Sequence, residues 1–460
     1  MSASVAADRR VEPAVGAPGS LPPAIVLGGR NALSVVRSLG RSGVPVLVPA
    51  AHDNVRVLAS RYARAVTVPA GPAAWHERVA GWLLGPEARP LHGAVILACN
   101  DPGVETLARH RAELLPLYRL DLGNPAAQLA MLDKLETYRL AREAGVDAPA
   151  WWAIEDEADL ERIRDDLRFP LIVKPRSSAA FQRRFPGRKH LRVTTFDEAR
   201  TAVRAMREGG LRFVLVEFVP GPDDRACTYC TYVDERGEPV CDFTIRGIRR
   251  SPPGEGESTY VVSERFPELA TPALRLVRHA GLIGLACIEF KLDERNGRMK
   301  LLECNCRFVA PNPLLIGSGL DLAPWIYRRA LGLPAGTLPE WRAGIRLWDP
   351  VRDYRSYRAL ARAGETTLWQ WLRSLRPART FWFRPDDPMP TLVHAWRVAA
   401  SRTRAAMRRR PPPSTLDDRN PAQEVRSIRM RPRRPQRGPV EPSDGARGPA
   451  PVRPPGEGAP

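Results

Sequence analysis

Short apolar runs alternate with stretches of helical periodicity in the first part of the chain. Residues 24–28, 44–48 and 94–98 are apolar runs that predict buried strands. Helices are predicted over residues 32–39 and 103–115, where apolar side chains recur every three or four positions. Strands and helices that alternate in this way are typical of a parallel α/β domain, which we place at residues 23–122.

The first predicted strand ends in Gly28-Gly29, which Arg30-Asn31-Ala32-Leu33 follows. A dinucleotide-binding turn requires the pattern G-x-G-x-x-G, and the third glycine is missing here. This segment is therefore weak support for a nicotinamide cofactor.

The pattern changes twice after this domain. Residues 125–144 predict one helix that ends at Gly145, and the chain is then rich in strands to about residue 308. Within that part, shorter helices are predicted over 157–167, 197–208 and 270–280. Beyond Gly332 the pattern becomes helical and rich in tryptophan.

Both ends of the chain lack the apolar content of a folded domain. Residues 1–22 are polar and interrupted by proline, so we predict a disordered leader instead of a signal peptide. From Arg397 onward the chain holds 15 arginines against 6 acidic residues. We predict a disordered tail over residues 411–460. Two roles stay open for it: weak contact with nucleic acid or an anionic surface, or no binding role.

Lysine is rare in this arginine-rich chain, whose formal net charge is +19. Of 70 basic residues only five are lysine, and all five lie between residues 134 and 300. A compact ammonium differs chemically from a guanidinium fork, so the clustering indicates positions that require lysine. The alternative is chance.

Seven cysteines are scattered along the chain without the spacing of a disulfide framework. This pattern favours a reducing compartment, and we expect a cytoplasmic protein. The apolar runs are too short for a membrane span.

The strongest chemical signal lies in a predicted hairpin. Residues 288–290 and 301–307 form two strands, joined through a turn at Asn296-Gly297. Because side chains alternate along a strand, Glu303, Asn305 and Arg307 share one face. With Glu289 they offer two carboxylates and an amide oxygen, which suit Mg²⁺ or Mn²⁺, and a guanidinium that can neutralise phosphate.

Two other interpretations of this hairpin are open. Cys304 and Cys306, or Cys227 and Cys230, could form a thiolate metal site, although residues three apart on a strand face opposite ways. Glu303 and Asn305 could also lie on a solvated face, but Leu301-Leu302 directly before them predicts a buried strand.

At these residues the sequence resembles the ATP-grasp superfamily, whose metal-binding strand has the form Glu-x-Asn-x-Arg. The resemblance covers roughly residues 120–332 and is strongest to the carboxylate–amine ligase branch, which includes D-aspartate ligases and relatives of the carbamoyl-phosphate synthase large subunit. It implies a mixed α/β and α+β fold. That fold consists of a Rossmann-like pre-ATP-grasp domain (23–122), a two-lobed ATP-grasp domain (123–332), a helical extension (333–410) and the tail.

The resemblance also assigns residues to roles. Lys134 and Lys174 match the two lysines that hold nucleotide phosphates, and Glu217-Phe218-Val219 matches the hinge that holds adenine. Asp224 matches the acidic residue at the ribose, with Asp223 as the alternative. Glu289, Glu303 and Asn305 match the metal ligands, and Arg307 is a catalytic residue.

Two further segments follow from the same resemblance. The polar, basic stretch between Lys174 and Val193 resembles a mobile loop that closes over the triphosphate and excludes water. Arg246, in Phe243-Thr-Ile-Arg246, is the candidate for stabilising an acyl phosphate, with a surface arginine as the alternative.

The function implied by the resemblance is an ATP- and Mg²⁺-dependent ligase. Such an enzyme activates a small carboxylate as an acyl phosphate and condenses it with an amine, releasing ADP and phosphate. A homodimer is a further expectation. The alternatives are a nucleotide-binding module without ligase activity, and a protein that works through its basic tail.

Overall fold

A computed structural model describes residues 21–51, 54–178, 181, 184–185, 188–375 and 377–408 of the chain. Nearly all of the predicted leader and all of the predicted tail lie outside these residues. The chain divides into a compact unit of residues 1–401 and a second unit of residues 402–460. In the part that the structure describes, no helix combines the length and apolar composition that a membrane crossing requires.

The first sheet is five-stranded and entirely parallel, in the order β3-β2-β1-β4-β5. Its strands are β1 (Ala24–Leu27), β2 (Val46–Pro49), β3 (Ala63–Val66), β4 (Val95–Ala98) and β5 (Arg119–Leu120). The helical segments around it are α1 (Ala32–Arg41), α2 (Val55–Leu58), α3 (Trp75–Leu84), η2 (Pro86–Leu91), α4 (Asp101–Arg109) and α5 (Arg111–Leu114). The predicted parallel α/β fold of this part is confirmed.

The strand order of this sheet reverses between β1 and β4, so the loops that leave these two strands open a crevice at the carboxyl edge. Gly28 follows the last residue of β1. A side chain would not fit at this position, because its Cβ atom would lie 2.7 Å from the Cβ of Cys99. Close packing of the loops after β1 and β4 therefore explains why residue 28 is glycine, without any need for a dinucleotide-binding turn.

Three predicted helices are shorter than expected. The helix over 125–144 is two helices, α6 (Pro125–Leu132) and α7 (Lys134–Glu143), because Asp133 has an extended backbone and its Oδ1 accepts from the Leu135 N–H at 3.0 Å. Caps of this kind start a helix. The predicted helix over 103–115 is likewise divided into α4 and α5, and that over 157–167 into α8 (Glu157–Arg162) and η3 (Arg164–Asp166).

The second sheet is antiparallel and has the order β6-β9-β7-β8. Its strands are β6 (Trp151–Trp152), β7 (Leu171–Pro175), β8 (Leu191–Val193) and β9 (Phe213–Glu217). Helices α8 and α10 (Phe196–Glu208) pack on one face through a buried apolar cluster that includes Leu160, Val203 and Met206. Leu135 and Tyr138 of α7 pack against Val214 and Val216 of β9.

The third sheet has seven strands in the order β14-β13-β10-β11-β12-β15-β16. They are β10 (Ala226–Val233), β11 (Pro239–Ser251), β12 (Glu257–Ser263), β13 (Gly284–Asp293), β14 (Arg298–Asn305), β15 (Arg346–Trp348) and β16 (Arg379–Thr380). The predicted hairpin is β13–β14, and Gly297 turns it with a φ of 69°. The remaining segments before residue 349 are η4 (Asp223–Arg225), η5 (Pro267–Leu269), α11 (Ala270–His279), α12 (Asn312–Ser318) and α13 (Leu322–Ala330).

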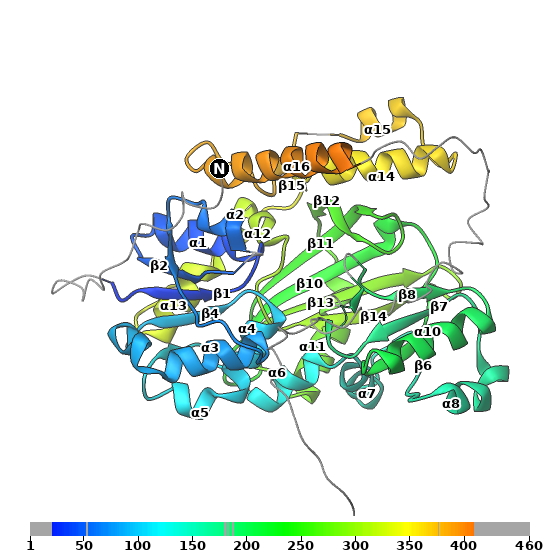
Figure 1. The fold of residues 1–460 in the computed structure, drawn as a ribbon, viewed down its shortest axis with the longest axis horizontal. Helices are drawn as coiled ribbons and strands as arrows, with labels where there is room; N and C mark the ends of the chain where they lie inside the picture. Colours follow the sequence, from blue (N-terminus) through cyan, green and yellow to red (C-terminus); the bar gives the residue numbers. More distant parts are fainter. Residues whose placement is uncertain are drawn as a thin grey trace, which may run out of the picture. The chain divides into compact units, whose positions relative to one another are not determined.

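The part of the compact unit after residue 332 contacts elements of both the first and the third sheet regions (Figure 1). It contains β15, β16 and the helices α14 (Pro350–Arg362), α15 (Leu368–Ser374) and α16 (Met389–Arg408). Two buried ion pairs hold it: Arg249 of β11 with Asp353 of α14, and Arg37 of α1 with Asp387. The Arg249 Nε and Nη2 atoms donate to Asp353 at 2.7 and 2.8 Å.

Removing one partner of the Arg249–Asp353 pair leaves a buried charge without a counter-ion. We expect Asp353→Ala to lower the free energy of unfolding by about 3–5 kcal/mol, because the carboxylate is fully buried. Thermal or urea unfolding followed by circular dichroism measures this. As a control, Glu157→Ala breaks the exposed pairs with Arg204 and Arg207, where we expect little change. Equal effects of the two changes would contradict the argument.

A partly buried carboxyl, that of Asp121, joins the first sheet to the third. The Tyr232 Oη donates to Asp121 Oδ1 at 2.6 Å, and burial raises the pKa of Asp121 to about 6, although the hydrogen bonds of the carboxylate oppose the shift. An unfolded aspartate titrates near pH 4, roughly. The folded state therefore binds an extra proton between about pH 4 and 6, and loses stability as the pH rises through this window.

Replacing Asp121 by asparagine removes the charge and keeps an oxygen that can accept from Tyr232. We expect the stability of Asp121→Asn, relative to the natural chain, to increase as the pH rises from about 4 to 7. Melting temperatures of both proteins across this pH range test the prediction. A difference that does not depend on pH would show that burial of the charge is not costly here.

Candidate active site

A cavity of about 630 Å³ lies where the three sheets meet. Its walls include the loops after β1 and β4, strands β7 and β9 of the second sheet and strands β10 to β14 of the third. Asp349, Arg352, Phe381 and Trp382 of the C-terminal segment also line it. The cavity has the size of a small-molecule site and is polar on several sides.

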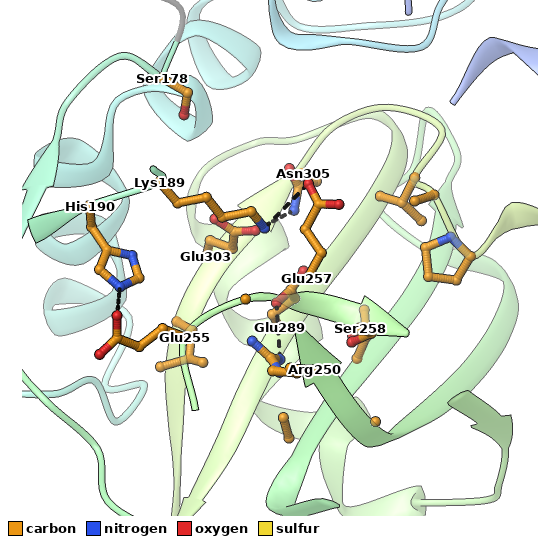
Figure 2. A pocket seen from close by; sticks show the side chains of 18 of the residues that line it. Ser178, Lys189, His190, Arg250, Glu255, Glu257, Ser258, Glu289, Glu303 and Asn305 are labelled. Carbon is orange, nitrogen blue, oxygen red and sulfur yellow. Dashed lines mark hydrogen bonds and ion pairs between the residues drawn. The ribbon is translucent and has the colours of Figure 1, made fainter. Parts of the chain in front are cut away.

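The centre of the cavity is an oxygen-rich cluster on β13 and β14. Glu289 and Glu303 lie directly opposite each other in the strand register. Asn305 is nearly buried, and its Nδ2 donates to Glu303 Oε1 at 3.1 Å (Figure 2). Cys304 and Cys306, on the other face of β14, pack into an apolar cluster. The structure therefore brings together the three predicted metal ligands.

The donor set of this cluster fits Mg²⁺ better than a soft metal. Mg²⁺ in nucleotide sites takes one or two protein carboxylates and completes its shell with phosphate and water oxygens. Among the described residues, no group of three or more His, Cys, Asp and Glu side chains could enclose a metal. Two carboxylates and an amide leave open positions of the kind that phosphate oxygens fill.

The two carboxylates differ in their surroundings. Burial raises the pKa of Glu289, and the charge of Glu303 adds to this shift. Burial also opposes ionisation of Glu303, but Lys134, Lys189 and Lys174 outweigh it and hold the pKa of that carboxyl below its usual value. Lys134 Nζ lies 3.8 Å from Glu303 Oε2. A cation bound between the carboxylates would relieve the repulsion that raises the pKa of Glu289.

The two predicted phosphate lysines both line the cavity. Lys134 is the first residue of α7, and Lys174 lies on β7. The Lys174 Nζ donates to Tyr138 Oη at 2.8 Å and to the Leu302 carbonyl at 3.3 Å. Both of these acceptors are neutral. An ammonium with neutral partners keeps its charge available for an anion.

The predicted adenine hinge, Glu217-Phe218-Val219, forms an edge of the cavity. The Glu217 carboxylate accepts from Arg295 Nη1 at 2.6 Å, so this side chain forms an ion pair within the protein. Lys291 Nζ donates to the carbonyls of Val219 at 3.0 Å and Gly221 at 2.8 Å and fixes the backbone that follows. Backbone groups beside the Phe218 ring can hold a flat heterocycle.

The two candidates for the ribose-binding acid differ in position. Asp223 lines the cavity, and its carboxylate accepts at 2.9 Å from the N–H groups of Arg250 and Gly254. Asp224 is not part of the described cavity wall, and within the described residues its buried Oδ1 has no hydrogen-bond partner. The geometry favours Asp223 over Asp224, and the ribose role of either residue stays a prediction.

Of the two predicted catalytic arginines, Arg307 lines the cavity and Arg246 does not. Arg307 lines the cavity, with its Nε 2.5 Å from Asp101 Oδ1. Burial opposes its charge, but Asp101 outweighs burial and raises the pKa of Arg307. Arg246 does not join the described cavity, because alternation turns Ile245 and Gly247 into it and Arg246 towards Glu264, 2.8 Å away. Bulges after Gly247 bring Arg250 in, with its Nη2 3.7 Å from Glu289.

Several cavity residues were not assigned individual roles from the sequence, although Lys189 and His190 belong to the predicted mobile loop. Lys189 and His190 reach it from the segment before β8, and Glu255 and Glu257 from the start of β12 (Figure 2). His190 lies 3.6 Å from Glu255, and Lys189 lies 3.8 Å from Glu257. The rarity of lysine was a usable signal for Lys189 and Lys291, whereas nothing in the spacing marks the two glutamates. Part of the predicted mobile loop lies outside the described residues.

No family model matches the chain. A curated D-aspartate ligase from Enterococcus faecium (strain Aus0004) is 22% identical over 244 residues, which span 50% of this chain and 57% of that protein. The chain thus matches less than two thirds of the length of this relative. This partial match agrees with the resemblance of the predicted motifs, and it does not by itself establish the activity of this chain.

Solved structures that resemble the chain share its architecture. A biotin carboxylase domain of Hydrogenobacter thermophilus 2-oxoglutarate carboxylase has a TM-score of 0.54 and 16% identity, with 70% of this chain and 73% of that one covered. The fold is ATP-grasp. L-amino acid ligase from Bacillus licheniformis shares it with a TM-score of 0.53 and 17% identity, with 70% of this chain and 77% of that one covered. N5-carboxyaminoimidazole ribonucleotide synthetase from Thermus thermophilus also shares it, with a TM-score of 0.53 and 17% identity, and with 70% of this chain and 81% of that one covered.

The oxygen cluster of this ATP-grasp fold predicts binding of a divalent cation. We expect Glu303→Gln and Glu289→Gln each to weaken binding of Mn²⁺ in the presence of ADP by about tenfold or more, because each removes a carboxylate ligand. Electron paramagnetic resonance of free Mn²⁺ measures this without reference to turnover. The exposed Glu268→Gln is the control. Unchanged Mn²⁺ binding in both cluster variants would place the cation elsewhere.

Proposed function

We propose that the protein is an ATP-dependent ligase that activates a carboxylate and joins it to an amine. One observation carries the proposal. Glu289, Glu303 and Asn305 share one cavity with Lys134 and Lys174, which approach from other elements. This combination offers a cation site beside two ammonium groups. Such groups position a phosphoryl group and stabilise its negative charge during transfer.

The chain's own residues would divide the work as follows. The backbone around Phe218 and Val219 holds the adenine, and Lys174 and Lys134 hold phosphate oxygens. Glu289, Glu303 and Asn305 would hold Mg²⁺, which offsets charge on the transferring phosphoryl group. Lys189 lies at the same cluster and adds a further positive charge.

The proposed reaction has two steps. A carboxylate oxygen of the substrate attacks the γ-phosphorus of ATP, the bond to the bridging oxygen breaks, and ADP leaves with that electron pair. An amine then attacks the acyl carbon, phosphate leaves with the electrons of the acyl–oxygen bond, and the proton that the nitrogen loses passes to the released phosphate. Arg307 and Arg250, both in the cavity wall, lie where they can stabilise the negative oxygens of these states.

The similar proteins support this class of reaction without naming a substrate for this chain. The names of two of them, D-aspartate ligase and L-amino acid ligase, describe ligases of amino acids. Three of the similar solved structures hold ADP, one of them also as MgADP. These names and the cavity both fit an amino acid or another small acid as substrate.

A cytoplasmic location and a homodimer are further parts of the proposal. All seven cysteines lie in the described residues with free thiols, which fits a reducing compartment. The similar carboxylase domain is a dimer in its crystal structure, which fits the expected homodimer. The proposed contact of the tail with nucleic acid or an anionic surface concerns residues outside those described.

Release of ADP with mixed amino acids, small carboxylates and amines tests the ligase directly. We expect turnover that needs both a carboxylate and an amine, and a loss of roughly 100-fold or more in Glu303→Gln, because the bound cation contributes several kcal/mol to the transition state. The variant should melt at nearly the temperature of the natural chain, and Glu268→Gln should keep full turnover.

Two outcomes would count against the proposal. ATP that binds without any donor or acceptor raising turnover would indicate a nucleotide-binding module. Undiminished turnover in Glu303→Gln would remove the oxygen cluster from the mechanism.

A further inference from the structure

One wall of the cavity comes from neither of the two sheets that hold the predicted nucleotide site. Arg30 follows β1 of the first sheet, and Arg352, Phe381 and Trp382 belong to the C-terminal segment. Phe381 is nearly buried, and the Trp382 Nε1 donates to Asp349 Oδ2 at 3.1 Å. The wall therefore combines two guanidinium groups with two fixed aromatic rings.

The charges at this wall are unbalanced. Arg352 Nη1 lies 2.7 Å from Glu257 Oε2, Arg30 contacts Glu257 Oε1, and Lys189 lies 3.8 Å from the same oxygen. Burial opposes ionisation of Glu257, but Lys189, Arg30 and Arg352 outweigh it and lower the pKa of Glu257 to about 2. One carboxylate thus faces three cations. Asp349 adds a second carboxylate to this wall, and Arg56 adds a third guanidinium beside it. Even with Lys189 assigned to Glu303 and to phosphate, the three arginines exceed the two carboxylates by one positive charge.

Arg352 is held in place by its helix. Asp349 Oδ1 accepts from the Arg352 N–H at 3.2 Å and caps α14. The neighbouring Asp353 is fixed by Arg249 in the buried pair and by the Trp371 Nε1, 2.9 Å away. A guanidinium on a rigid helix is a better binding group than one on a loop, because less freedom is lost when a ligand binds.

We propose that Arg30 and Arg352 form a subsite for an anionic group of the second substrate, a carboxylate or a phosphate. The excess positive charge accepts one such group, and arginine forks match the geometry of both oxyanions. Phe381 and Trp382 flank the subsite and contact the hydrocarbon part of the ligand. The inference rests on the proposed function, in which the nucleotide would occupy the part of the cavity lined by Phe218, Val219, Lys134 and Lys174.

Binding of paired probes to the MgADP-loaded protein tests this subsite. Aspartate is compared with asparagine, and O-phosphoserine with serine, by isothermal titration calorimetry. We expect one acid to bind about tenfold or more tightly than its neutral partner, because it gains charge-assisted hydrogen bonds. The aspartate and phosphoserine arms distinguish a carboxylate from a phosphate ligand.

Variants link this preference to the two arginines. We expect Arg352→Gln and Arg30→Gln each to abolish the preference for the acid and to leave MgADP affinity within about twofold. Arg358→Gln, exposed on the same helix α14, is the matched control and should keep the preference. Normal MgADP binding and an unchanged circular dichroism spectrum show that each variant is folded.

The contrary results are separable. A natural chain that binds MgADP but no acid more tightly than its neutral partner overturns the subsite alone. The same holds when Arg352→Gln and Arg30→Gln both keep the preference. A natural chain that binds no MgADP overturns the proposed nucleotide site, and the subsite with it.

Discussion

The pairing of β13 with β14 is the constraint around which the cavity is organised. Its register sets Glu289 directly opposite Glu303, and like charges in such positions destabilise a sheet. Cations from other elements offset the repulsion: Lys134 from α7 lies near Glu303, and Arg250 from β11 lies near Glu289. Cations from the surrounding elements therefore lower the cost of placing two carboxylates at one point, and a divalent cation bound there would offset the remaining repulsion.

The parts of the site that sequence could predict are those set by local geometry. Period-two alternation places Glu303 and Asn305 on one face of a strand and Cys304 on the other, and an Asn-Gly turn fixes the hairpin. The parallel first sheet follows from apolar runs for the same reason. These features depend on neighbours a few residues away, so the chain carries their signal directly.

The parts that could not be predicted depend on contacts between distant segments. Bulges in β11 after Gly247 bring Arg250 into the cavity, and no residue type signals them. Regular alternation before the bulges turns Arg246 away. Arg352 reaches the cavity because the C-terminal segment folds back on β12 and β11. The break at Asp133 was also hidden, since α6 and α7 continue one apolar pattern. It places Lys134 at the start of a helix, beside the cluster that it serves.

The buried pair between Arg37 and Asp387 has a consequence for how the chain is made. Arg37 lies on the first helix, yet its Nε donates at 2.8 Å to a carboxylate 350 residues later. At about 5–20 residues per second, a ribosome needs on the order of 20–70 s to add that partner. A guanidinium is costly to bury alone, so α1 must keep this side chain hydrated throughout. The side chain of Arg37 therefore gains its buried partner only after the chain has been synthesised as far as residue 387.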